Sequence, residues 1–124
     1  MTESSARIRL LVVEDDAMQS EMVERALGRD GFEVRVARSV GELRTALTGF
    51  VPELVLVDVN MPDAPDGQMV GLVRDLVPTA RVILYSAWEE SKLRKLAKDL
   101  GAHGFISKSE SVFAIAGRLR EITR

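Results

Sequence analysis

The apolar run Leu-Val-Leu-Val at residues 54–57 constrains the fold of this chain more than any other stretch. Four consecutive apolar side chains leave no polar face, so the run predicts a strand buried on both sides of a parallel sheet. The run ends in the carboxylate of Asp58, and a turn rich in proline, glycine and aspartate follows. Open α/β sheets bind ligands at the carboxyl ends of their strands, so we expect Asp58 at a functional edge.

The bulk composition limits the class of protein. A chain of 124 residues with 46% apolar and 29% charged residues is expected to form one soluble globular domain. The net charge of −2 and the dispersed basic residues argue against direct nucleic-acid binding. The absence of cysteine excludes a disulfide scaffold and a thiolate metal site and suits the cytoplasm. No run reaches the ~20 apolar residues of a membrane span, and residues 1–7 are interpreted as a short disordered lead.

Apolar periodicity predicts five strands that alternate with five helices. The strands are expected at residues 8–13, 33–37, 53–57, 81–85 and 104–107, with helices starting near residues 17, 40, 68, 88 and 110. Strict alternation with short connections predicts one parallel sheet covered by helices on both faces. The first, third and fourth strands are the most apolar and therefore the most central, which predicts the strand order 2-1-3-4-5.

Local signals predict where several helices begin, end and face the core. Asp16 is the expected N-cap of the first helix, Ser39 and Glu42 have the spacing of a capping box, and Gly101 is suited to end the fourth helix. Helical spacing predicts one buried face on the first helix, formed by Met18, Met22, Val23, Ala26 and Leu27.

Chemically active side chains follow four of the predicted strands. Glu14 and Asp15 follow the first, Asp58 the third, Ser86 the fourth and Lys108 the fifth. Three carboxylates at one edge repel each other unless a cation joins them, and oxygen ligands favour Mg²⁺. The simplest interpretation is phosphorylation of Asp58, with the metal and Lys108 neutralising the phosphoryl oxygens and Ser86 donating a hydrogen bond.

Each of these residues also has a purely structural explanation. Acids favour helix N-termini, an aspartate can form a turn, a serine can cap a helix, and a lysine can be a solvated charge at a strand end. Their joint placement at carboxyl ends of strands, in the order acid pair, acid, hydroxyl and lysine, favours the functional interpretation.

Four motifs carry a resemblance to a known family: LVVEDD (11–16), LVDVNMP (56–62), ILYSA (83–87) and GFISK (104–108). In this order and spacing the chain resembles the receiver domain of two-component response regulators, from about Ile8 to Ile122. The resemblance implies a flavodoxin-like (βα)₅ fold and a single receiver domain over 8–124. It also implies that the domain is not an enzyme beyond its own phosphorylation and dephosphorylation.

The resemblance assigns roles around Asp58. This residue corresponds to the aspartate that accepts a phosphoryl group from the phosphohistidine of a sensor histidine kinase or a phosphotransfer protein. Asp15 corresponds to a direct Mg²⁺ ligand and Glu14 to an acid that reaches the metal through water. The backbone carbonyl of Asn60 corresponds to a further ligand, and the Asn60 side chain lies at a position that modulates the reaction.

The resemblance also implies a switch. Ser86 and Lys108 hold the phosphoryl oxygens, and Phe105 turns inward as Ser86 moves. The surface of the fourth helix, fifth strand and fifth helix changes and serves an output partner that the sequence does not identify, or a weak homodimer of an otherwise monomeric protein. The charged residues of that helix are either a solvated face or part of this surface: Lys92, Arg94, Lys95 and Lys98.

The chain departs from the family pattern at two loops. Ser109 replaces the usual proline after the lysine, which predicts a trans peptide and a cap from Ser109 or Ser111. The loop 61–67, beside the expected kinase docking site, is one residue longer, and its Asp63 and Asp66 either add charge there or serve as ordinary turn residues.

Two further residues have open roles. Trp88 occupies a position that influences dephosphorylation in the family, so it could shield the acyl phosphate, or it could be a half-packed surface residue. His103 is expected to be structural because nothing places it near the acids.

Two other functions compete with a phosphorylated receiver. One is a pseudo-receiver that binds partners without phosphate, which the departures at Ser109 and the loop keep open. The other is a small phosphatase, but Asn60 stands where such an enzyme would carry its general acid.

Overall fold

The computed structural model describes residues 7–64 and 67–123, so most of the expected lead at 1–7 and the loop residue Asp66 lie outside the described residues. Five parallel strands form one sheet in the predicted order, β2-β1-β3-β4-β5. The strands are β1 (Ile8–Val13), β2 (Phe32–Ala37), β3 (Leu54–Asp58), β4 (Arg81–Ser86) and β5 (Gly104–Ser107). The helices are α1 (Ala17–Gly28), α2 (Val40–Ala46), α3 (Gln68–Leu76), α4 (Glu90–Leu100) and α5 (Val112–Thr123).

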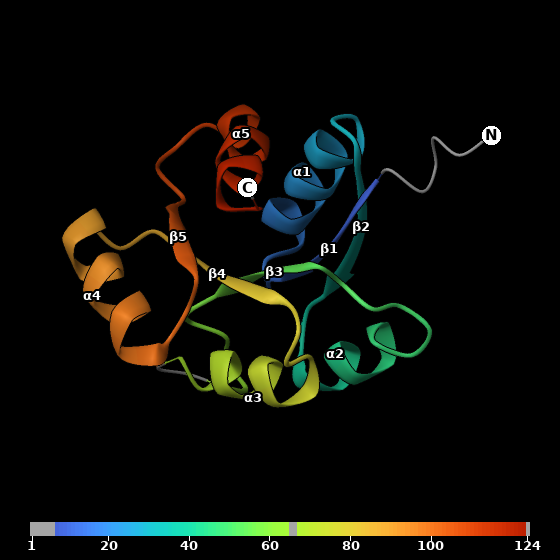
Figure 1. Cartoon of the computed structure of the whole chain (residues 1–124), viewed down its shortest axis with the longest axis horizontal. Coiled ribbons are helices and arrows are strands. Elements are labelled where there is room, and N and C mark those ends of the chain that lie inside the picture. The colour runs from blue at the N-terminus through green and yellow to red at the C-terminus, as the bar shows by residue number, and fades with distance from the viewer. Residues whose placement is uncertain (1–6, 65–66, 124) are drawn as a thin grey trace.

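Helices cover both faces of the sheet, with α1 and α5 on one side and α2, α3 and α4 on the other (Figure 1). The two cores divide the residues of β3 by strict alternation. Val55 and Val57 pack on the α2–α3–α4 side, whereas Leu54 and Leu56 pack on the α1–α5 side. All four are fully buried, which explains why the run has no polar position. By the same alternation Asp58, the next residue in line with Leu56, belongs to the α1–α5 side.

The predicted helix ends are largely confirmed. The side chain of Asp16 accepts a hydrogen bond from the Gln19 amide (2.9 Å), and Gly101 ends α4 with a φ of 71°. Ser39 caps α2 by accepting from the Glu42 amide (3.1 Å). The reciprocal half of the capping box differs, because Glu42 accepts from the Arg38 amide (2.9 Å), one residue before the N-cap.

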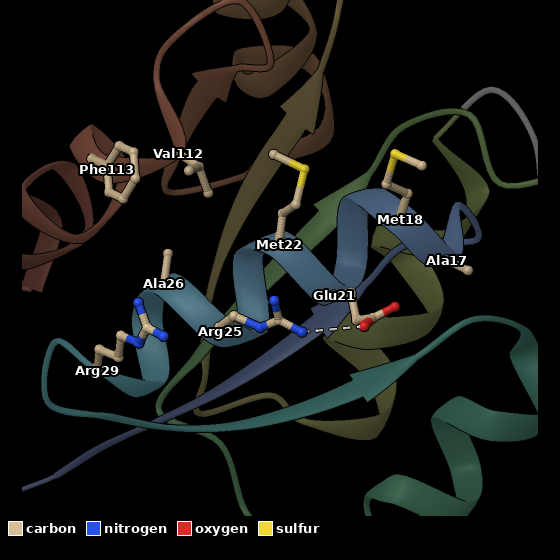
Figure 2. Close-up of a pocket in the computed structure, with 9 residues that line it drawn as sticks. All are labelled: Ala17, Met18, Glu21, Met22, Arg25, Ala26, Arg29, Val112 and Phe113. Carbon is tan, nitrogen blue, oxygen red and sulfur yellow. Dashed lines mark hydrogen bonds and ion pairs between the residues drawn. The ribbon is translucent and has the colours of Figure 1, made fainter.

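The predicted buried face of α1 is wrong at two positions. Met18 and Met22 are 73% and 47% exposed, and the helix buries Ser20, Val23 and Leu27 instead. At 100° per residue the two methionines lie on the side of the helix opposite this stripe. Ser20 can face the sheet because its hydroxyl donates to a carbonyl of its own helix (3.1 Å). Figure 2 shows both methionines on the α1 surface that faces Val112 and Phe113 of α5.

The start of α4 also differs slightly from the prediction. The helix begins at Glu90 rather than near Trp88, with Glu89 as an extended N-cap residue. The Trp88 amide donates to the Ser86 hydroxyl (3.1 Å), which holds the backbone around Ala87 in a turn. Ser86 therefore stabilises the turn before the helix and is not its N-cap.

Candidate functional site

Three carboxylates meet at the carboxyl edge of the sheet, as the strand order predicted. Glu14 follows β1, Asp15 stands beside it, and Asp58 ends the neighbouring strand β3. One carboxylate oxygen from each lies within 4.8 Å of the other two. Glu14 is 1% exposed and Asp58 is 5% exposed, whereas Asp15 is half-buried. We call these three residues the acid cluster.

Lys108 is the cation that the described structure places against the acid cluster. Its Nζ lies 2.6 Å from Glu14 Oε1 and 3.4 Å from Asp58 Oδ2. Its backbone amide donates to the carbonyl of Ser86 (2.7 Å), which fixes the start of the side chain. Burial alone would lower the pKa of Lys108, but Glu14 and Asp58 outweigh burial and raise the pKa above its usual value. One ammonium therefore partly compensates three carboxylates.

The pKa of Glu14 is perturbed by its burial in the acid cluster. Burial raises the pKa of Glu14 from 4.5 to about 7, and the nearby Asp58 adds to the rise, while Lys108 and the Asp16 amide oppose it. Glu14 Oε2 accepts from that amide (3.1 Å). Glu14 Oε1 is buried and lies against the Lys108 ammonium. Three carboxylates that share one ammonium offer hard oxygen ligands, which fits a site for a divalent cation such as Mg²⁺.

Asn60 and the loop that follows β3 come directly after Asp58 in the chain. The Asn60 amide donates to Asp58 Oδ1 (3.0 Å) and fixes one carboxylate oxygen. Met61 and Ala64 are buried and form an isolated bridge. Asp63 accepts from the Val40 amide (2.7 Å), so it supports the start of α2 through a contact distant in sequence rather than through the local turn chemistry that was one of its two expected roles.

Ser86 and Phe105 lie on the other side of the sheet from the acid cluster. Ser86 is 1% exposed, and its hydroxyl accepts from the Trp88 amide. The Phe105 ring is half-buried against the α2–α3–α4 core, and the Arg94 guanidinium lies 5.5 Å from its centroid. Trp88 is also half-buried there, with Lys92 Nζ 5.3 Å from its ring. These residues border the site, and their predicted switching roles stay predictions.

The structure of the turn after Lys108 confirms part of what the sequence predicted. The peptide bonds of the described chain are trans, that between Lys108 and Ser109 included. The Ser109 amide donates to the Ser107 hydroxyl (3.1 Å), while Ser111 caps α5 by accepting from the Phe113 amide (3.2 Å). His103 is structural, as predicted, because its Nδ1 accepts from the Val82 amide (2.9 Å) near the opposite edge of the sheet.

Sequence reasoning missed Tyr85 and Gln19. Tyr85 pairs in register with Asp58, is 2% exposed, and accepts a hydrogen bond from the Gln19 side chain. Burial, more than any other cause, raises the pKa of the Tyr85 hydroxyl. Lys108 Nζ lies 5.2 Å from the centroid of the Tyr85 ring. The available signal was the position of Tyr85, one residue before Ser86 on the strand next to Asp58.

Comparison with known proteins identifies the same architecture. The response regulator protein PilR of Pseudomonas aeruginosa is 30% identical over 117 residues, which are 94% of this chain and 25% of PilR. The chemotaxis protein CheY4 of Vibrio cholerae superposes with a TM-score of 0.83 at 22% identity, covering 94% and 99% of the two chains. A putative response regulator from Chloroflexus aurantiacus gives a TM-score of 0.82 at 26% identity, covering 95% and 99%.

The chain spans about half or less of the length of the curated relatives it matches, with 51%, 48%, 25% and 20% for four of them. Within residues 7–64 and 67–123, none of the helices has the length and apolar character that a membrane crossing requires. The sequence model of the response regulator receiver domain matches residues 10–120. The chain therefore belongs to the response regulator receiver domain family of two-component systems.

Proposed function

We propose that this receiver domain, over residues 8–124, accepts a phosphoryl group on Asp58 in a reaction that requires Mg²⁺. The observation that carries the proposal is the convergence of the acid cluster with Lys108 at one edge of the sheet. Without a cation, this arrangement leaves unbalanced negative charge around a buried nucleophile. With a cation and an incoming phosphoryl group, the same residues become complementary to the ligand.

The residues that would hold Mg²⁺ are Asp15, Asp58, the backbone carbonyl of Asn60, and Glu14 through water. Bound there, Mg²⁺ supplies positive charge to the phosphoryl oxygens. Their donors are all oxygen atoms, which is the ligand set that Mg²⁺ prefers.

The transfer itself uses one oxygen of Asp58. In the structure Oδ1 accepts the Asn60 amide, while Oδ2 faces Lys108. A carboxylate oxygen attacks the phosphorus of a phosphohistidine, an oxygen–phosphorus bond forms, and the phosphorus–nitrogen bond breaks. The imidazole nitrogen keeps the electron pair and is protonated from solvent, and Asp58 becomes an acyl phosphate.

Lys108 and Ser86 would respond to the new charge. Phosphorylation adds about −1.5 to −2 charge and three strong acceptors. Lys108 then contacts a phosphoryl oxygen, and the Ser86 hydroxyl leaves the Trp88 amide to donate to another. The movement of Ser86 frees space into which Phe105 turns, and this changes the surface of α4, β5 and α5.

We assign the phosphodonor to a sensor histidine kinase or a phosphotransfer protein of the cytoplasm, because homologous response regulators imply this class of partner. The surface of α4, β5 and α5 would bind the output partner or form a weak homodimer. The intact acid cluster and Lys108 count against a pseudo-receiver, and Asn60 in place of a general acid counts against a phosphatase.

The test is reaction of the protein with acetyl phosphate and beryllofluoride, with and without Mg²⁺, followed by intact mass and Trp88 fluorescence. We expect one phosphoryl group and a fluorescence change, both dependent on Mg²⁺ and both lost in Asp58→Asn. The matched control is Asp75→Asn, which removes the same charge from the exposed surface of α3. No adduct at saturating Mg²⁺ would contradict the proposal, and so would an adduct that persists in Asp58→Asn.

A further inference from the structure

Lys108 must cross a strand to reach the acid cluster. It follows β5, whereas Asp58 ends β3, and β4 lies between these strands. Neighbouring strands are about 4.8 Å apart, so the two side chains together bridge about 10 Å. The β4 residue in register with Asp58 is Tyr85. Residues in register on parallel strands point to the same face, so the Tyr85 side chain lies beneath the path that Lys108 takes.

The Tyr85 ring makes a direct contact with the lysine. Lys108 Nζ lies 5.2 Å from the ring centroid, within the range in which an ammonium is attracted to an aromatic face. The side chain of Lys108 is 21% exposed, which reduces the competition from water. Lysine is otherwise a flexible four-carbon stem with a point charge, so its direction depends on what surrounds it.

The ring is itself held from α1. The Gln19 side chain donates to the Tyr85 hydroxyl, and the Gln19 amide donates to Asp16 (2.9 Å). The Asp16 amide donates in turn to Glu14 (3.1 Å), whose other oxygen faces Lys108. These contacts therefore form a closed ring that connects the start of α1 with Tyr85 and Lys108.

We propose that Tyr85 is a positioning residue for phosphoryl transfer: its ring holds the Lys108 ammonium over Asp58 and Glu14, and Gln19 holds the ring. The inference rests on the proposed function for its effect on transfer. Its structural part, the placement of the ammonium by the ring, can be measured without any transfer.

The variant Tyr85→Leu removes the ring and the hydroxyl, whereas Tyr85→Phe removes the hydroxyl alone. A cation–π contact of this kind corresponds to a factor of about five to ten, so we expect acetyl phosphate to react about five to ten times more slowly with Tyr85→Leu. Tyr85→Phe keeps the ring and should stay within about twofold of the unsubstituted protein. Tyr85→Met, which fills the space with a flexible side chain, replaces Tyr85→Leu if the latter does not fold.

The matched control is Phe32→Leu. Phe32 is another buried aromatic of the α1–α5 core, but it begins β2 at the opposite edge of the sheet. Its replacement should lower stability as Tyr85→Leu does and leave the reaction rate unchanged. A loss of rate in Phe32→Leu equal to that in Tyr85→Leu would mean that destabilisation alone explains the effect, and would overturn the proposal.

Two readouts separate positioning from packing. A ring above the lysine shifts the NMR signals of the Lys108 ε-methylene protons, so these signals should be displaced in the unsubstituted protein and in Tyr85→Phe but normal in Tyr85→Leu. In a Lys108→Met background, Tyr85→Leu should cause no further loss of rate, because the residue it positions is absent.

Unchanged lysine signals in Tyr85→Leu would overturn the proposal, as would an equal loss of rate in the Lys108→Met background. If the unsubstituted protein forms no phosphoryl adduct, the proposed function fails, and the lysine signals alone decide whether Tyr85 places Lys108. The two failures are therefore distinguishable.

Discussion

Replacing Asp58 with asparagine should stabilise the protein when no divalent cation is present. One carboxylate oxygen from each of Asp58, Glu14 and Asp15 lies within 4.8 Å of the other two. At an effective dielectric constant of ~20, each repulsion felt by an ionised Asp58 is about 3.5 kcal/mol. Lys108 at 3.4 Å offsets about 5 kcal/mol of this repulsion. Because Asp15 is half-buried and its charge is partly screened, the net repulsion is roughly 1–2 kcal/mol.

The measurement is urea and thermal unfolding in EDTA at about pH 8.5, where Glu14 is largely ionised. The asparagine of Asp58→Asn keeps the shape of the side chain and an acceptor for the Asn60 amide, so repulsion is the main quantity that changes. We expect the free energy of unfolding to rise by roughly 1–2 kcal/mol and the Tm to rise by about 4 °C per kcal/mol.

Mg²⁺ should reduce or reverse this difference. A cation at one hundred times its Kd stabilises the folded protein by about 2.7 kcal/mol, and Asp58→Asn, which lacks one of the proposed ligand carboxylates, should gain less. Asp75→Asn is the control and should change neither the stability in EDTA nor the response to Mg²⁺. Destabilisation by Asp58→Asn in EDTA would refute the view of the acid cluster as a site of unbalanced charge.

Four further outcomes follow from single residues. Between about pH 4.5 and 7 the folded protein binds more protons at Glu14 than the unfolded chain does, so the free energy of unfolding without metal should fall as pH rises. Glu14→Gln should flatten this slope, as measured by urea titrations at several pH values. Ser39→Ala should cost about 1 kcal/mol in urea unfolding because α2 loses its N-cap, and no change would contradict the cap. Met22→Gln should change the free energy of unfolding by no more than about 0.5 kcal/mol, whereas Leu27→Ala should lower it by about 2–5 kcal/mol. Equal losses would mean that Met22 is buried in the core. Gly67→Ala should lower the Tm, because a left-handed φ of 79° costs a residue with a side chain about 1–2 kcal/mol, and the new methyl group would also clash with Leu100. An unchanged Tm would argue against this backbone conformation.

The strand order and the acid cluster were predictable because their signals are local. The run before Asp58 has no polar position, and parallel strands bring their carboxyl ends to one edge whatever the details of packing. Lys108 was predictable for the same reason, since it directly follows a strand.

Features that depend on how elements dock were not predictable. Apolar spacing marked Met18 and Met22 as buried, but the face of α1 is chosen by its fit against the sheet, where the small Ser20 packs. The sequence left the role of Asp63 open between added charge and turn chemistry. The hydrogen bond that Asp63 accepts from the Val40 amide depends on the placement of α2 beside the loop after β3. Such contacts join residues far apart in the sequence, so no local pattern reports them.

The register between β3 and β4 could not be predicted from the sequence either, and it determines which side chains lie beside Asp58. A shift of one residue would exchange the faces on which Tyr85 and Ser86 lie. In the observed register Tyr85 is paired with Asp58, so Tyr85 and Lys108 approach the carboxylate from the α1–α5 face, while Ser86 lies on the α4 face. A phosphoryl group on Asp58 would then be held from both faces of the sheet. In the proposed mechanism Ser86 approaches the phosphoryl group from the α4 side, so this register is compatible with transmission of the switch through Ser86 and Phe105 toward α4.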